Sequence, residues 1–177
     1  MAEKNDYVNR ELSWIEFNYR VLSEARDKST PLFDRLKFLS ITASNLDEFY
    51  MVRVASLKDM VHAKYAKKDI AGLTAKEQLD KISEETHQLV DLQYSTYNRS
   101  LVPALKQNGL RIVMEHEDLT EDEAAFADEY FHKNVYPVLT PMAFDSSRPF
   151  PLIRNKTLNI AALLKKKNEK EAELEFA

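Results

Sequence analysis

The chain has 177 residues, of which 44% are hydrophobic and 31% are charged, with only two glycines and no cysteine. This length fits one domain or two small ones, and the absence of cysteine excludes disulfides and thiolate metal sites. Residues 1–109 hold 16 basic and 16 acidic residues, whereas residues 110–177 hold 9 and 13 and carry the whole net charge of −4. The basic surplus typical of a nucleic-acid-binding domain is missing, so we expect no nucleic-acid partner.

The hydropathy of the chain bears on its location. Residues 1–6 have no apolar segment typical of a signal peptide, and no apolar run approaches the ~20 residues that cross a bilayer. A chain without cysteine is also compatible with a reducing compartment. We expect a soluble, cytoplasmic protein with no integral membrane segment.

Residues 9–27 are predicted to form the first helix. Their apolar side chains recur at spacings of three and four and form two neighbouring stripes. A face this wide indicates a helix covered by more than one neighbour. The first stripe holds Leu12, Ile15, Tyr19 and Leu22, and the second holds Trp14, Phe17, Val21 and Ala25.

A second helix is predicted after Pro31, which suits the first turn of a helix. Residues 41–45 combine β-branched residues with Ser and Asn, whose side chains compete for backbone hydrogen bonds. We therefore expect a kink or a new start there, with Ser44 or Asn45 as the N-cap. The helix is then predicted to continue as far as Val61.

A third, long helix is predicted from Thr74 to Gly109, after a polar loop at residues 64–73. Thr74 and Glu77 have the spacing of a capping box, and Gly109 suits the C′ position that ends a helix. These roughly 34 residues would span about 50 Å at 1.5 Å per residue. We expect residues 1–109 to form a domain that is an antiparallel helical bundle.

The segment after Gly109 is predicted to hold a strand, a helix and then an extended loop. Residues 110–114 are a strand candidate, and Thr120 with Glu123 forms a second capping box that opens a helix to about residue 135. Four prolines between residues 137 and 151 then favour an extended, ordered loop.

The last part of the chain is predicted to contain strands. Residues 158–164 form one candidate, a charged turn follows at 165–170, and residues 173–176 alternate polar and apolar side chains. Because the sequence stops within this last candidate, we expect residues 110–177 to be the beginning of a truncated α+β head domain. The predicted fold class is α+β, with the helical bundle first, and we expect the chain to be a fragment of a longer protein.

Four stretches of the sequence resemble the polyphosphate kinase family, in that family's order and at its spacing, and they cover nearly the whole chain. They are YVNRELSWIEFN at 7–18, NLDEFYMVR at 45–53, PVLTPMA at 137–143, and RPFP at 148–151 with LNI at 158–160. The chain departs from the pattern at Arg148, where many relatives have a histidine, and we assign Arg148 no role.

The resemblance implies a four-part enzyme. A helical N-terminal domain and a head domain used in oligomer contacts precede two C-terminal catalytic domains. Such an enzyme reversibly moves the terminal phosphate of ATP to a polyphosphate chain through a phosphorylated histidine, with Mg²⁺. The catalytic histidine and the Mg²⁺ site belong to the C-terminal half, so the resemblance assigns no catalytic or metal-binding residue to this chain. It also implies a homo-oligomer, either a dimer or a tetramer.

One ligand residue carries over from the resemblance. Asn45 stands at the family position that contacts the adenine of ATP. A carboxamide offers a donor and an acceptor side by side, which match the N6 and N7 edge of adenine. Asn is also a leading N-cap residue, and the two roles are compatible. We favour the nucleotide contact.

Other residues carry groups that could bind a ligand or take part in catalysis. Arg53 could reach a phosphate, but we favour an ion pair with Asp47, Glu48 or an acid on another helix. No spacing among the four histidines suggests a metal site, and we interpret them as ordinary helix or loop residues. The histidines are His62, His87, His116 and His132. Two lysine clusters, at 64–68 and 165–170, are interpreted as solvated surface rather than a polyphosphate track.

The two glycines, Gly72 and Gly109, are too few for a Gly-rich phosphate loop. ATP is therefore expected to be touched here at its base or sugar only. The alternative function is a non-catalytic helical module that binds a partner protein.

Overall fold

The computed structural model describes residues 7–142, 149–164 and 175–176. The chain forms two compact units, the first ending at Ile112 and the second beginning at Val113. Among the described residues, no helix is both long enough and apolar enough to cross a membrane.

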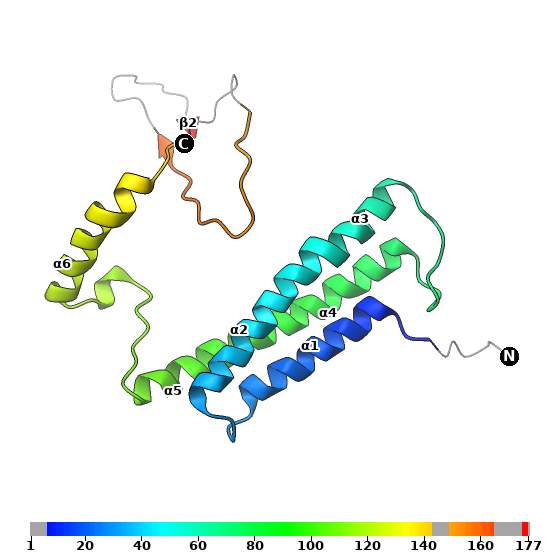
Figure 1. Ribbon diagram of the computed structural model, residues 1–177, viewed down its shortest axis with the longest axis horizontal. Coiled ribbons are helices and arrows are strands. Elements are labelled where there is room, and N and C mark those ends of the chain that lie inside the picture. Colours follow the sequence, from blue (N-terminus) through cyan, green and yellow to red (C-terminus); the bar gives the residue numbers. More distant parts are fainter. Residues whose placement is uncertain (1–6, 143–148, 165–174, 177) are drawn as a thin grey trace. The chain divides into compact units, whose positions relative to one another are not determined.

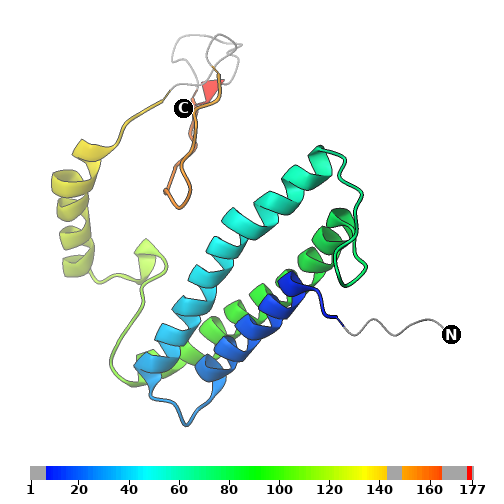
Figure 2. The ribbon, with the colours of Figure 1, turned by 45° about the vertical axis from the view of Figure 1, so that its right-hand side comes forward.

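The first unit is a bundle of three helical rods, drawn in blue to green in Figures 1 and 2. Helix α1 (Arg10–Arg26) is the first rod, and it packs against both of the others, as the wide apolar face predicted. The second rod is α2 (Leu32–Phe49), the π-helical segment η1 (Tyr50–Val54) and α3 (Ala55–His62). The third rod is α4 (Ala75–Thr96), the π-helical η2 (Tyr97–Leu101) and α5 (Val102–Gln107). The predicted N-terminal helical bundle is confirmed.

The helix ends of this unit follow from local side-chain chemistry. The Thr74 side chain accepts from the Glu77 backbone N–H, and the Glu77 side chain accepts from Thr74 N, so the predicted capping box at the start of α4 is present. Gly109 ends the third rod with a φ of +82°, a conformation that favours glycine. Leu110 N donates to Leu105 O at 3.0 Å across this end.

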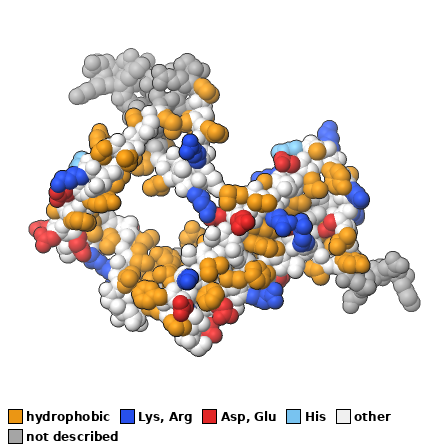
Figure 3. All heavy atoms as spheres, in the orientation of Figure 1, with side chains coloured by type: hydrophobic (Ala, Val, Ile, Leu, Met, Phe, Trp, Pro, Cys, Tyr) orange, Lys and Arg blue, Asp and Glu red, His pale blue; other side chains and the backbone are white. Residues whose placement is uncertain are grey.

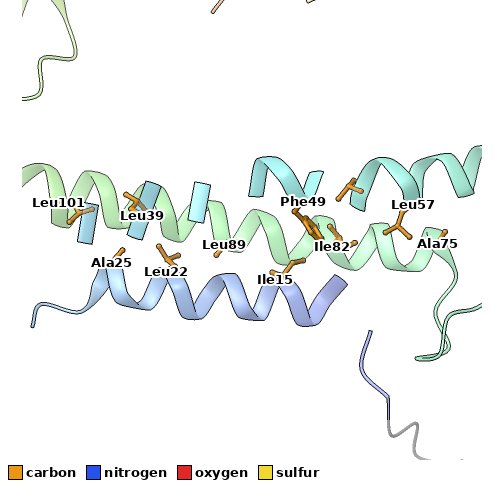
Figure 4. Close-up of a cluster of buried hydrophobic side chains, with 11 residues drawn as sticks. Ile15, Leu22, Ala25, Leu39, Phe49, Leu57, Ala75, Ile82, Leu89 and Leu101 are labelled. Atoms are coloured by element: carbon orange, nitrogen blue, oxygen red, sulfur yellow. The ribbon is translucent and has the colours of Figure 1, made fainter. Parts of the chain in front are cut away.

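The core lies along the line where the three rods meet, and Figure 4 shows its apolar side chains pointing inward from all of them. From α1, the buried stripe runs through Ile15, Asn18 and Leu22. Phe17, which the second predicted stripe placed inside, is instead 46% exposed. The polar Asn18 in the middle of this stripe is completely buried.

The predicted kink or restart at residues 41–45 is wrong, because α2 runs unbroken through them to Phe49. Thr42 is accommodated within the helix because its hydroxyl donates to Leu39 O at 2.7 Å. The irregular segment of this rod is η1, further along, and nothing in its sequence explains the position. The π-helical η2 ends two residues before Pro103, whose missing N–H interrupts the regular helical ladder.

The second unit is helical over much of its described length. It holds a short 3₁₀ turn η3 (His116–Asp118), then α6 (Glu121–Tyr130), which extends into the π-helical η4 (Phe131–Val135) and the 3₁₀ turn η5 (Tyr136–Val138). The capping box of Thr120 and Glu123 opens α6 as predicted.

The predicted α+β class is wrong. The described strands are only β1 (Leu163–Leu164) and β2 (Glu175–Phe176), two residues each, paired antiparallel. Residues 110–114 form no strand, and the candidate at 158–164 is reduced to its last two residues. Strand formation needs a paired neighbour, and β-branched composition alone does not supply one. The predicted turn at 165–170 lies outside the described residues.

Candidate functional site

A groove of about 590 Å³ lies between α1 and the rod formed by α2, η1 and α3. Trp14 and Phe17 line it from α1, Asn45 and Phe49 line it from α2, and Arg53 lines it from η1. The groove therefore brings Asn45 and Arg53, both singled out from the sequence, into one surface with two aromatic residues of α1.

Asn45 lies near the C-terminal end of α2 and not at a helix start, so its interpretation as an N-cap is wrong. Its side chain is half-buried, and Nδ2 donates to Asn18 Oδ1 at 3.1 Å. Within the described part of the chain, Asn45 Oδ1 has no hydrogen-bond donor. The acceptor and the second N–H of this amide thus have no hydrogen-bond partner among the residues that the structure describes.

The orientation of the Asn45 amide follows from the groups behind it. Asn18 Nδ2 donates to the backbone carbonyl of Thr42 at 3.1 Å. A carbonyl only accepts, so Asn18 must turn its nitrogen to Thr42 and its oxygen to Asn45. Asn45 must in turn present its nitrogen to Asn18, which leaves Oδ1 on the far side of the amide.

Aromatic rings form the apolar part of the groove. Trp14 and Phe49 stack with ring centroids 4.3 Å apart and an angle of 6° between their planes. Phe17 is the exposed aromatic residue of this wall, and the Arg20 guanidinium lies 5.8 Å from its ring centroid. Flat apolar rings beside an amide are suited to a flat ligand that also has a hydrogen-bonding edge.

A charged cluster occupies another part of the groove. The Glu11 carboxylate is only 8% exposed, and its Oε1 accepts from Arg10 Nε and Nη2 at 3.0 and 2.6 Å. Arg53 Nη1 lies 3.8 Å from the same oxygen. Arg53 therefore pairs with an acid on another helix, as expected, although Arg10 makes the shorter contacts.

Comparison with known families accounts for both units. The family model for the polyphosphate kinase N-terminal domain matches residues 7–113. The model for the polyphosphate kinase middle domain matches residues 122–177. The chain belongs to the polyphosphate kinase family.

Individual members of the polyphosphate kinase family align with nearly the whole chain. It is 54% identical to a polyphosphate kinase of Lactiplantibacillus plantarum over 165 residues, covering 93% of this chain and 23% of that protein. It is 51% identical to one from Bacillus anthracis, covering 94% of this chain and 24% of the relative. The crystal structure of polyphosphate kinase from Porphyromonas gingivalis superposes on 97% of this chain with a TM-score of 0.78 and 32% identity, and 25% of that protein is covered. The chain thus spans about a quarter of the length of these polyphosphate kinases.

Sequence reasoning marked Asn45 as an expected ATP contact and Arg53 as an ion-pairing residue, but it missed Asn18, on which the Asn45 amide depends. A signal was present, because Asn18 lies three residues after Ile15 and four before Leu22, on the buried stripe of α1. A polar residue on such a stripe needs a buried partner. The sequence could not show that this partner is Thr42, 24 positions away.

The polar end of the groove is tied together by Asp69, in the loop before α4. Asp69 accepts from the Ala71 and Leu73 backbone at 3.0 and 2.8 Å, and from Asn9 Nδ2 at 2.6 Å. Burial alone raises the pKa of the Asp69 carboxyl, but these hydrogen bonds together outweigh it and hold the pKa below its ordinary value. Asn9 is also the N-cap of α1, so the network joins this loop to the start of the first helix.

Among the described residues, the remaining sequence candidates are not part of the groove lining. His62 ends α3, and His116 lies 3.7 Å from Asp128 in the second unit. In the part of the chain that the structure describes, no group of His, Cys, Asp and Glu is arranged to hold a metal ion. The cluster at residues 64–68 lies in the exposed loop after α3, whereas Arg148 and the lysines at 165–170 lie outside the described residues.

Proposed function

We propose that this chain supplies the nucleotide side of a polyphosphate kinase, an enzyme that reversibly transfers the terminal phosphate of ATP to polyphosphate through a phosphohistidine. In this proposal the groove receives the adenine ring, and the Asn45 amide binds the N6 and N7 edge of the base. The enzyme acts in the cytoplasm as a homo-oligomer, dimer or tetramer, whose contacts the second unit helps to form.

The observation that carries this proposal is the unused hydrogen-bonding capacity of Asn45 inside an aromatic groove. Adenine presents a donor at N6 and an acceptor at N7, and an amide oxygen with an N–H complements that pair. Stacking on an exposed aromatic face would add to this contact, and Phe17 offers one. The names of the relatives supply the second support, since each is a polyphosphate kinase.

The phosphates and Mg²⁺ are assigned to parts of the enzyme outside residues 1–177. Lys, Arg and acidic side chains are interspersed with apolar ones over the bundle face seen in Figure 3, rather than forming a broad basic track. Transfer then follows the usual division of labour, with positioning by the nucleotide site and charge stabilisation by metal and basic groups near the reacting phosphate.

The test compares wild type and Asn45→Ala in a polyphosphate kinase of the relatives' length that carries this sequence as residues 1–177. Polyphosphate synthesis is recorded with kcat and the KM for ATP. Loss of two hydrogen bonds to the base, each contributing about 0.5–1.5 kcal/mol, predicts a KM raised at least about fivefold. The unfolding midpoint should fall as well, because the buried Asn18 Oδ1 loses its partner. Ser44→Ala, an exposed neighbour on α2, is the matched control and should change neither value.

Two results would count against the proposal. An unchanged KM together with a lower unfolding midpoint would make Asn45 a purely structural residue. Failure of the wild-type enzyme to make polyphosphate from ATP would instead favour the helical protein-interaction module.

A further inference from the structure

We propose that Asn18 is a positioning residue that fixes the orientation of the Asn45 amide and thereby makes the groove selective for adenine over guanine. This inference rests on the proposed function, in which Asn45 contacts the base. To that contact it adds Asn18, a residue that touches no ligand itself, and it assigns to Asn18 the control of adenine selectivity.

A relay of two hydrogen bonds connects the Thr42 backbone carbonyl, through Asn18, to Asn45. It starts at the carbonyl, which can only accept a hydrogen bond. The Thr42 backbone carbonyl accepts from Asn18 Nδ2 at 3.1 Å, and Asn18 Oδ1 accepts from Asn45 Nδ2 at 3.1 Å. Turning either amide over would set two acceptors or two donors against each other at that distance. Asn18 is fully buried, so water cannot compensate for such a mismatch. One backbone carbonyl therefore determines which atoms of Asn45 face the groove.

A fixed amide distinguishes the two purines because their exposed edges differ. Adenine offers the N6 amino donor beside the N7 acceptor, whereas guanine offers two acceptors, O6 and N7. With Nδ2 held by Asn18, Oδ1 faces the position of the exocyclic group. It accepts from the adenine amino group but meets the guanine carbonyl as one acceptor against another. An amide free to rotate could present its NH₂ alone to the guanine edge, donate to both O6 and N7, and lose this discrimination.

The position of Asn18 on the buried stripe is the second reason for assigning it this role. An apolar residue would fill the bundle core equally well at this position. A buried amide is tolerated only when its oxygen and nitrogen both have hydrogen-bond partners. Both of its heavy polar atoms have partners, and the outer partner lines the groove. Thr96, another buried polar residue of this core, donates within its own helix, to Leu92 O at 2.7 Å.

The experiment measures kcat and KM with ATP and with GTP for Asn18→Leu and Asn18→Ala in a polyphosphate kinase of the relatives' length carrying this sequence. The ratio of kcat/KM for ATP over GTP should fall at least about fivefold, the smaller end of what one bidentate base contact discriminates. The change should lie in the KM for ATP, with kcat kept within about twofold. Thr96→Val is the control, because it removes a buried hydroxyl of the same core and should leave the ratio unchanged.

The parallel variant Asn45→Ala separates the two proposals. If it leaves the KM for ATP unchanged, the proposed base contact fails and the inference fails with it. If Asn45→Ala lowers the ATP over GTP ratio but the folded Asn18 variants keep it, the inference alone is overturned. A fall of the ratio in Asn18 and Asn45 variants, without one in Thr96→Val, supports the relay.

If both Asn18 variants fail to fold, a measurement on the unsubstituted chain tests whether Asn18 holds the Asn45 amide. In the ¹⁵N-labelled 177-residue chain, the Nδ2 proton that Asn45 donates to Asn18 and the Nδ2 protons of the buried Asn18 should exchange with solvent at least about tenfold more slowly than those of the exposed Asn98. Exchange of the Asn45 proton as fast as that of Asn98 would show that the Asn45 amide is not held and would overturn the inference.

Discussion

Polar side chains inside the helical bundle are held by specific partners from distant parts of the chain. Asn9 illustrates this, because its Oδ1 caps α1 while its Nδ2 donates to Asp69 and to Gln78 Oε1 at 2.9 Å. Asn18 and Asn45 form a second such set at the groove. A buried polar group left without a partner costs about 1–3 kcal/mol, so a single substitution in either set should measurably lower the free energy of unfolding.

Asp69→Asn is predicted to lower the free energy of unfolding by about 1–3 kcal/mol at pH 7. One Asp69 oxygen accepts from two loop N–H groups and the other accepts from Asn9, so the NH₂ of a substituted amide would face a donor in either orientation. Denaturant unfolding of the 177-residue chain measures the change. Asp59→Asn, at an exposed position on α3, is the control and should be neutral.

The pH dependence of this residue gives a second readout. Hydrogen bonds lower the pKa of Asp69 in the folded state below its ordinary value of 3.8. The ionised carboxylate therefore contributes fully to the free energy of unfolding at a pH well above 3.8, and this contribution is lost as the pH falls through the folded-state pKa. The stability difference between wild type and Asp69→Asn should therefore shrink in acid below about pH 4. A difference that stays constant from pH 7 to pH 3 would contradict the role of the ionised carboxylate.

At the scale of elements, helix starts are defined by local chemistry and helix interiors by packing. Two capping boxes open α4 and α6 with the same Thr and Glu pattern, in two separate units. In contrast, the β-branched and polar run at 41–45 does not interrupt α2, because that helix is covered by α1 and keeps its backbone ladder.

Thr74→Ala is predicted to destabilise the bundle by about 0.5–2 kcal/mol through loss of the cap of α4. Thermal unfolding, followed by circular dichroism and by the single tryptophan, Trp14, measures this. The same change at Thr120 removes an equivalent cap from the second unit and should leave the unfolding midpoint reported by Trp14 unaltered. Equal shifts from both changes would mean that the two units unfold together.

At the scale of the whole molecule, this chain carries one side of a proposed substrate site. It spans about a quarter of the length of the polyphosphate kinases that it matches. One amide contact contributes about 0.5–1.5 kcal/mol, whereas even a millimolar Kd requires about 4 kcal/mol. Tight nucleotide binding is therefore expected only where phosphate-binding groups join the groove.

The 177-residue chain alone is predicted to bind ATP with a Kd above about 1 mM, as measured by isothermal titration calorimetry. Asn45→Ala provides the comparison at the same concentrations. A Kd in the micromolar range that Asn45→Ala weakens would mean that these residues also hold the phosphates, contrary to the division of labour proposed above.

The candidate site shows how far sequence reasoning reaches. The family motif marks Asn45 as an expected ATP contact, which stays a prediction, and residue chemistry predicted the ion pairing of Arg53 with an acid on another helix. The groove and the partner of Asn45 were not foreseen. Both depend on which face of α1 meets α2, and that is decided by contacts between residues tens of positions apart.

By itself, the sequence determined the family, the three-rod bundle, both capping boxes and the glycine that ends the third rod, because these depend on local periodicity, short-range hydrogen bonds and family motifs. Only the tertiary structure decided that α2 continues through 41–45, that Phe17 is exposed, and that the strand candidates form a single two-residue pair within the described residues. The physical reason is the same in each case. Burial and strand pairing are energies of contact between distant segments, and these energies override local propensity.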